Sequence, residues 1–136
     1  MSGLLRRVIL LAALCLPSAA LAQAEGQIEV PRGLWETEPD FAGVILHVRT
    51  RRCGNALCGR VERAKNRAGF DAPSNAVGDK VLWEMRAQPD GSFFGEYRGP
   101  RAHRYLQSRA TVVGRELRLE VCDEEKCSAQ VWQRIR

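Results

Sequence analysis

Two pairs of cysteines with the same C-x4-C spacing, Cys53/Cys58 and Cys122/Cys127, constrain this chain more than any other feature. A fifth cysteine, Cys15, lies in an apolar segment near the N-terminus. An even number of cysteines behind an export signal is typical of disulfides, because oxidised thiols persist outside the cytosol. We therefore predict two disulfides, Cys53–Cys58 and Cys122–Cys127, each tying a strand hairpin near its turn.

Residues 1–22 have the three parts of a secretory signal peptide: two arginines, the apolar run Val8–Leu16 and a small-residue cleavage site that ends at Ala22. The apolar run is too short to span a bilayer as a permanent helix. We expect cleavage after Ala22, a single domain over 23–136, a periplasmic or secreted location, and no integral membrane segment. A retained anchor and a lipoprotein linked through Cys15 are the alternatives.

The charge balance is basic but modest. The chain has 21 Lys and Arg against 16 Asp and Glu, a net charge of +5. The leader holds two of the arginines and no acid, so its removal lowers the charge by two, to +3. Since an exported protein rarely meets nucleic acid, we expect no nucleic-acid partner. Contact with an anionic envelope surface is compatible with this charge.

Short runs rich in Val, Leu, Thr and aromatic residues alternate with Gly, Pro, Asp and Asn through the mature chain, a pattern of strands and tight turns. Strands joined in sequence close most easily as an antiparallel up-and-down barrel, which leaves no sheet edge unpaired. The stretch 66–79 is expected to be a loop, and Pro89-Asp90-Gly91 a hairpin turn. The eight strands are expected near 33–37, 42–52, 57–65, 80–88, 92–98, 103–113, 115–122 and 127–135.

The cysteine spacing also predicts the register of the first hairpin. If Cys53 lies directly opposite Cys58, then Arg49 lies opposite Glu62, and Arg51 lies opposite Arg60. Because side chains alternate between the two faces, an apolar stripe points inward while the disulfide lies outside.

The second hairpin gives the same division of faces. With Cys122 opposite Cys127, Leu117 lies opposite Trp132 on the inner face, and both cysteines lie on the outer face. Arg134 then points inward on the last strand.

One end of the barrel is expected to be sealed by residues of the first and last strands. Trp35 would be a large buried anchor, and Gly33 would allow close backbone packing beside it. Arg134 could lie over the Trp35 ring as a cation–π plug. A G-x-W on the first strand with an arginine on the last resembles the calycin superfamily of lipocalin-like barrels. The expected closing residues are Gly33, Trp35, Trp132 and Arg134.

A longer resemblance covers nearly the whole mature chain and ends in the W-x-R of Trp132 to Arg134. Its most specific part is the C-G-N-A-L-C-G-R-V stretch from Cys53 to Val61. In these motifs the chain resembles the bacterial family called domain of unknown function 2147. The members of that family are exported small proteins without a settled biochemical activity, so the resemblance implies location and fold rather than a reaction.

One surface cluster is unusual. Arg98, Arg101, His103 and Arg104 crowd a short segment that would be a loop. A solvated loop is the plain interpretation, and a docking point for an anionic headgroup or an acidic envelope partner is the functional one.

The sequence favours neither a metal site nor catalysis. Four thiolates would suit structural zinc, but the C-x4-C spacing is wider than the usual ligand pair and an oxidising compartment opposes free thiolates. A redox role would need a low-pKa thiol in a setting that this sequence does not show. His47 is expected on the outer face, solvated, and His103 in an exposed loop, and common catalytic motifs are missing. We expect no cofactor and no enzymatic activity.

Two functions remain open. The first is a binding module for a small apolar or amphiphilic ligand, because an eight-stranded barrel can hold one small molecule. The second is an envelope interaction protein with a filled barrel that acts through its surface. Bulky residues favour a mostly filled interior with a shallow mouth pocket: Trp35, Leu46, Val48, Val61, Trp83, Phe93, Tyr97, Leu117, Leu119 and Trp132.

Overall fold

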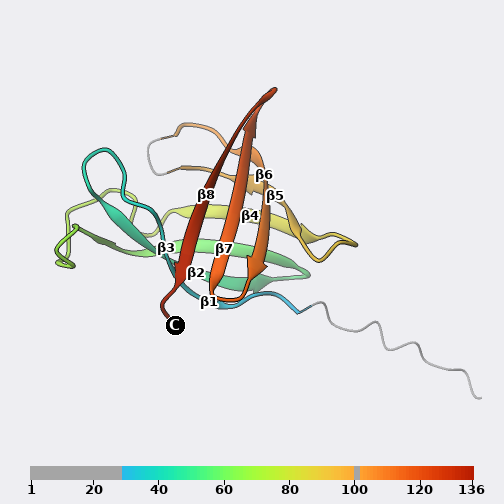
Figure 1. The fold of residues 1–136 in the computed structure, drawn as a ribbon, viewed down its shortest axis with the longest axis horizontal. Coiled ribbons are helices and arrows are strands. Elements are labelled where there is room, and N and C mark those ends of the chain that lie inside the picture. The colour runs from blue at the N-terminus through green and yellow to red at the C-terminus, as the bar shows by residue number, and fades with distance from the viewer. Residues whose placement is uncertain (1–28, 100–101) are drawn as a thin grey trace, which may run out of the picture.

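The chain folds into a closed antiparallel barrel in which eight strands follow one another in sequence order (Figure 1). The structure, a computed structural model, describes residues 29–99 and 102–136, so the predicted leader 1–22 and Arg101 lie outside the described residues. In the described part of the chain no helix is long and apolar enough to cross a membrane. The predicted fold class is confirmed. The strands are β1 (Gly33–Glu36), β2 (Ile45–Cys53), β3 (Ala56–Lys65), β4 (Lys80–Ala87), β5 (Phe93–Tyr97), β6 (Leu106–Val113), β7 (Glu116–Asp123) and β8 (Lys126–Arg134).

The barrel is strongly twisted. In the view of Figure 1, strands β2 to β4 cross strands β7 and β8 at a large angle, as the opposite walls of a closed sheet do. The turn of the β7–β8 ribbon extends beyond the other strands at the top of Figure 1. The loops that join β1 to β2 and β3 to β4 lie together at the left of the same view. The two loops touch, because the Arg67 side chain lies beside Gly43.

The first and last strands close the barrel over a short stretch. Trp35 pairs with Arg134 and Glu36 with Gln133 across β1 and β8. Backbone bonds extend this seam, since the Leu34 N–H donates to the Arg136 carbonyl at 2.8 Å. The residues after β8 therefore take part in the closure.

Apolar side chains fill the inside of the barrel. Phe93 is buried, as predicted, but Trp83 is half-buried on the outer face, so its predicted place in the core is wrong. The reason is an extra residue in β4 between the pairs Trp83–Glu96 and Arg86–Phe94, where Glu84 has a φ of 45°. The largest fully buried side chains are Trp35, Trp132, Leu57, Leu82, Met85, Leu117, Leu119, Val48, Val61, Val81 and Thr50.

The second hairpin has the predicted register. Cys122 lies directly opposite Cys127 and Leu117 opposite Trp132. The Cα atoms of the two cysteines are 4.0 Å apart, and the disulfide between them is present. Such a short distance suits a pair that exchanges no backbone hydrogen bonds across the ladder.

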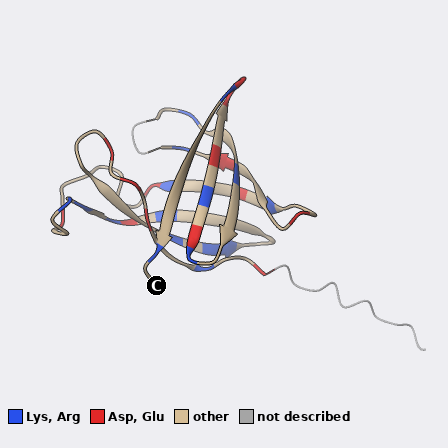
Figure 2. Cartoon of the chain, viewed as in Figure 1, with Lys and Arg blue, Asp and Glu red and all other residues tan. Residues whose placement is uncertain are grey.

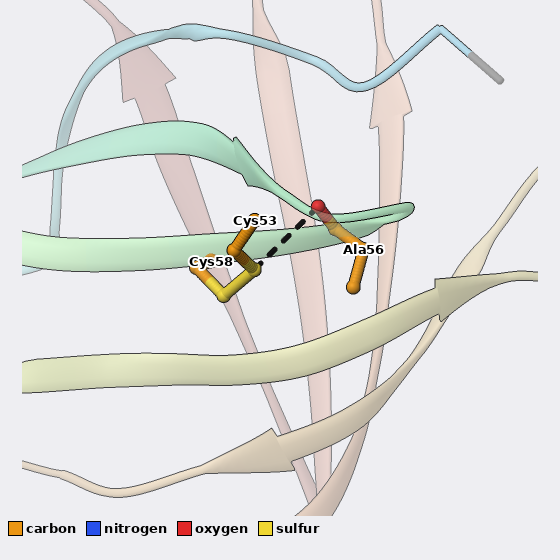
Figure 3. The surroundings of a disulfide bond; sticks show 3 residues. All are labelled: Cys53, Ala56 and Cys58. Atoms are coloured by element: carbon orange, nitrogen blue, oxygen red, sulfur yellow. Dashed lines mark hydrogen bonds between the residues drawn. A yellow bond between two sulfur atoms is a disulfide. The ribbon is translucent and has the colours of Figure 1, made fainter. Parts of the chain in front are cut away.

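The first hairpin has its predicted disulfide but a different register. Cys53 is bonded to Cys58 on the outside of the barrel (Figure 3). The predicted direct opposition is wrong: Cys53 lies opposite Ala56, and Arg51 lies opposite Cys58. The chain reverses over only Gly54 and the residue after it, with Gly54 at a φ of 61°, so the bond runs diagonally between Cα atoms 5.9 Å apart.

The shift amounts to two positions, so it preserves which side chains face outward. It places Arg49, rather than Arg51, opposite Arg60. The register then changes between Val48 and His47, because Glu62 is an extra residue on β3. Arg49 still reaches Glu62, through two bonds of 2.8 and 3.2 Å from its guanidinium.

Candidate functional site

The two ends of the barrel are closed by different means, and the end beside the C-terminus is sealed by side chains. The Arg134 guanidinium lies over the Trp35 ring, with Cζ 4.6 Å from the ring centroid. The Trp35 Nε1 donates to Thr50 Oγ1 at 2.8 Å. Gly33 lies against the backbone, since a Cβ there would come within 2.8 Å of the Arg136 carbonyl oxygen. Gly33, Trp35 and Arg134 thus lie together at this end, whereas Trp132 is buried beside Gln130, which lines the pocket at the other end.

The opposite end carries a small mouth pocket of about 220 Å³, lined by the loop after β1 and by Leu46 and Tyr97. That loop is tied down. Glu38 Oε1 accepts a hydrogen bond from the Val131 N–H at 3.2 Å, which fixes the loop to β8. Asp40 Oδ1 accepts from the Val44 N–H at 2.9 Å, which fixes the loop to itself. The mouth is therefore shallow and covered.

Polar groups form the floor of this mouth pocket. Trp132 Nε1 donates to Gln130 Oε1 at 2.7 Å, and the Tyr97 and Trp132 rings lie 6.4 Å apart between centroids. Burial raises the pKa of the Tyr97 phenol, while a side-chain hydrogen bond with Gln130 opposes that rise. These groups satisfy one another rather than facing an empty apolar chamber.

Hollows larger than the mouth pocket lie on the outside of the barrel. Two adjoining pockets of about 570 and 440 Å³ share the side chains of Arg49, Arg51 and Glu62 on β2 and β3. Figure 2 marks the basic positions of these strands in blue. We call this surface the arginine groove. Its lining comprises Arg32, Arg49, Arg51, Arg52, Arg60, Glu62, Lys80, Trp83 and Arg136, together with the outer side of the Cys53–Cys58 disulfide.

Positive charge is crowded in the arginine groove. Arg49 lies directly opposite Arg60, and like charges in such pairs are destabilising. A hydrogen bond from Arg49 lowers the pKa of the Glu62 carboxyl, so that carboxylate is held ionised beside the arginines. At the far end, Lys80 Nζ lies 3.9 Å from the centroid of the Trp83 ring, which faces outward.

The basic cluster predicted from the sequence is placed differently from the groove. Arg98 Nη2 lies 3.6 Å from Asp79 Oδ2, and Arg104 Nη2 lies 2.7 Å from Asp123 Oδ2. His103 is exposed. Both described arginines of this cluster thus have an acidic neighbour, and a docking role for the cluster stays a prediction.

His47 lies on the outer face, as expected, but it is largely buried rather than solvated. Its side chain is 14 % exposed, and its Nε2 lies 3.1 Å from Glu36 Oε2. The cause is the pairing of β1 with β2, which sets Glu36 directly opposite His47.

The four cysteines in the described part of the chain form two disulfides. Glu120 lies beside Cys122 and Cys127, and together they form a group with metal-ligand spacing. The two sulfur atoms are bonded to each other, so they offer no thiolate for zinc.

Comparison of the chain with protein families, with curated proteins and with solved structures finds no match. The resemblance to domain of unknown function 2147 therefore stays a prediction from the motifs. What the structure defines is the class: a closed eight-stranded antiparallel barrel with two hairpin disulfides.

Sequence reasoning did not single out the arginine groove as a site. Arg49 and Arg51 alternate along one strand, which puts both on one face, and this signal is visible in the sequence. The contribution of Arg60 depends on the register, and that of Arg32 and Arg136 on the closure of the barrel. Trp83 joins the groove only because of the irregularity in β4.

Proposed function

We propose that this protein is a non-enzymatic binding protein that works through the outer surface of its barrel. The observation that carries the proposal is the filled interior. Trp35, Trp132, Leu57 and Met85 each have less than 2 % of their surface exposed and occupy the space that an enclosed ligand would need.

The sizes of the pockets favour the outside as well. Ligand sites usually measure roughly 300–1,000 Å³. The mouth pocket, at about 220 Å³, is below this range. The two hollows of the arginine groove, at about 570 and 440 Å³, are within it.

The proposal includes a periplasmic or secreted location, membership in the family of domain of unknown function 2147 and a partner in the cell envelope. Two disulfides support an oxidising compartment. The absence of enzymatic activity is part of the proposal, and the surroundings of His47 support it. That histidine pairs with a glutamate on the outer wall, away from the mouth pocket and the groove.

The second candidate function is a module for a small apolar or amphiphilic ligand. Val44, Leu46 and Tyr97 favour it, because they line the mouth pocket with apolar surface. Such a ligand would have to displace the loop that Glu38 ties to β8.

Two measurements on the exported, oxidised protein separate these candidates. Native mass spectrometry should give the mass of the polypeptide with two disulfides and no added small molecule. The neutral dye N-phenyl-1-naphthylamine should show no saturable rise in fluorescence, since a filled barrel has no apolar chamber to receive it.

The Leu46→Trp variant serves as the matched control, because it adds bulk at the mouth pocket without touching the arginine groove. A co-purified small molecule, or saturable dye binding that this variant abolishes, would move the binding site into the mouth and contradict the proposal.

A further inference from the structure

We propose that the arginine groove binds an acidic oligosaccharide chain. This inference rests on the proposed function, because it names the ligand class of a protein that binds on its outer surface. It has its own test, which can fail while the filled barrel and the surface role still stand.

The charge of the arginine groove is unbalanced. Seven cationic side chains line the two hollows, and Glu62 is the single acidic one among the described residues of the lining. Arg49 and Arg60 face each other across the two strands, and Arg51 follows Arg49 on the same face. Like charges held this closely repel each other, and a bound anion would relieve the repulsion.

The chemistry of the hydrogen-bond donors in the groove favours an acidic ligand. Six of the seven cations are arginines, whose planar guanidinium matches a carboxylate, sulfate or phosphate through two parallel hydrogen bonds. The Nε and Nη2 groups of Arg49 already donate hydrogen bonds to Glu62. Arg51 and Arg60 are exposed. Arg60 Nη1 donates to the Gly78 carbonyl at 2.6 Å, which leaves the other N–H groups of its guanidinium for an acidic ligand.

The shape of the groove favours a chain over a single ion or a flat surface. The two hollows adjoin and share Arg49 and Arg51, so they form one elongated concave site. Acidic groups repeated along a chain could occupy both hollows at once, which increases affinity through effective concentration. A flat bilayer would contact the rims of these hollows without filling them.

An aromatic ring lies at one end of the groove and suits a sugar ligand. Trp83 faces outward beside Lys80, whose ammonium group lies near the ring. A half-buried indole that faces outward offers an apolar surface to the C–H groups of a sugar ring, while the neighbouring cation attracts its acidic substituent. The predicted exported location makes a polysaccharide a more accessible polyanion than a nucleic acid.

The test measures binding of two defined probes by isothermal titration calorimetry: a heparin octasaccharide, which is sulfated, and an oligogalacturonate, which is carboxylated. The wild-type protein should bind at least one of them, with an affinity that falls steeply as salt rises. Arg51→Gln combined with Arg60→Gln should weaken binding about tenfold or more, because two charge-assisted contacts are lost.

Arg98→Gln combined with Arg104→Gln is the matched control. It removes the same charge from the basic cluster outside the groove, and binding should change less than about twofold. If the groove variant fails to fold, as circular dichroism would reveal, Trp83→Leu provides a second variant of the same site. It should weaken binding without altering net charge.

Several results would overturn the inference. Equal binding of a neutral dextran would remove the need for acidic groups, and equal loss in both double variants would show that net charge alone matters. Binding to phosphatidylglycerol vesicles without binding to either oligosaccharide would indicate a membrane surface instead. Absence of binding to both probes would refute the ligand class and leave the proposed surface function to its own test.

Discussion

The Arg134 guanidinium stacks on the indole of Trp35, with Cζ 4.6 Å from the ring centroid. The same two residues pair directly between β8 and β1. One contact therefore joins the last strand to the first and covers one end of the core. The buried Nε of Arg134 has no hydrogen-bond partner within the described chain. The cation–π contact with the Trp35 ring is therefore the main interaction that offsets the burial of this guanidinium.

Replacement of Arg134 by glutamine should lower the free energy of unfolding by about 1 kcal/mol, because the cation–π contact is lost and the Trp35 ring is uncovered. Urea denaturation followed by tryptophan fluorescence measures the change. Arg118→Gln, at an exposed position on β7, is the control and should stay within about 0.5 kcal/mol of wild type. Equal effects of the two variants would contradict a structural role for the stack.

Loss of either disulfide should cost about 2 kcal/mol, since both close loops with the same sequence separation of 5. The variants are Cys53→Ser with Cys58→Ser, and Cys122→Ser with Cys127→Ser. Denaturation in urea without reductant measures both. Peptide mapping without reduction is the control on connectivity, and a peptide that links Cys53 to Cys122 would refute the pairing.

Replacement of Gly95 by alanine should destabilise the barrel by about 1–3 kcal/mol, an overpacking effect. A Cβ at this position would lie 2.7 Å from the Glu84 carbonyl oxygen and 2.7 Å from the Met85 Cα, which belong to the irregular part of β4. Thermal unfolding tests this. Gly99→Ala is the matched control, because the nearest atom that its Cβ would meet is in the Tyr97 side chain, at 3.5 Å, an ordinary van der Waals distance. A Gly95 variant as stable as the control would show that β4 can move away.

Stability should fall at alkaline pH through Tyr97. Burial raises the pKa of its phenol above the ordinary value of about 10, with Gln130 opposing the rise. The folded state therefore holds the proton more tightly than the unfolded chain. The contribution of Tyr97 to the free energy of unfolding is fully present below the ordinary pKa and is lost as pH rises through the raised pKa.

The chain has two tyrosines, so the ultraviolet absorbance of tyrosinate in single Tyr→Phe variants reports on Tyr97. Tyr97→Phe should remove a component that titrates above the ordinary value, and Tyr105→Phe, which keeps Tyr97, should retain that component. A titration of Tyr97 below the ordinary value would contradict its burial in the mouth of the barrel.

Much of this fold could be predicted from the sequence, because strand patterning and disulfide geometry act locally. Cys122 and Cys127 stand directly opposite each other, so their spacing alone gave the correct register. Cys53 and Cys58 have the same spacing but bond diagonally, because the two-residue turn begins directly after Cys53, at Gly54, whereas in the second hairpin a two-residue turn is centred between the cysteines. Two geometries fit one spacing, and the position of the turn decides between them.

The placement of Trp83 and the assembly of the arginine groove could not be read in the same way. Period-two alternation assumes a regular strand, and the positive φ of Glu84 breaks the alternation in β4. The groove also needs Arg32 and Arg136 to meet β2, which depends on closure of the barrel. Arg98 and Arg104, which lie close together in the sequence, are instead paired with acids from other segments.

The central claim is that a filled barrel binds its partner on the outer face of β2 and β3. Amide chemical-shift mapping of the isotope-labelled protein with the heparin octasaccharide tests it most directly. We predict shifts at Arg49, Arg51 and Arg60 and at the Trp83 indole, with the amides of Val44 and Leu46 unchanged. Shifts confined to the mouth of the barrel, with none on the outer face of β2 and β3, would contradict the claim.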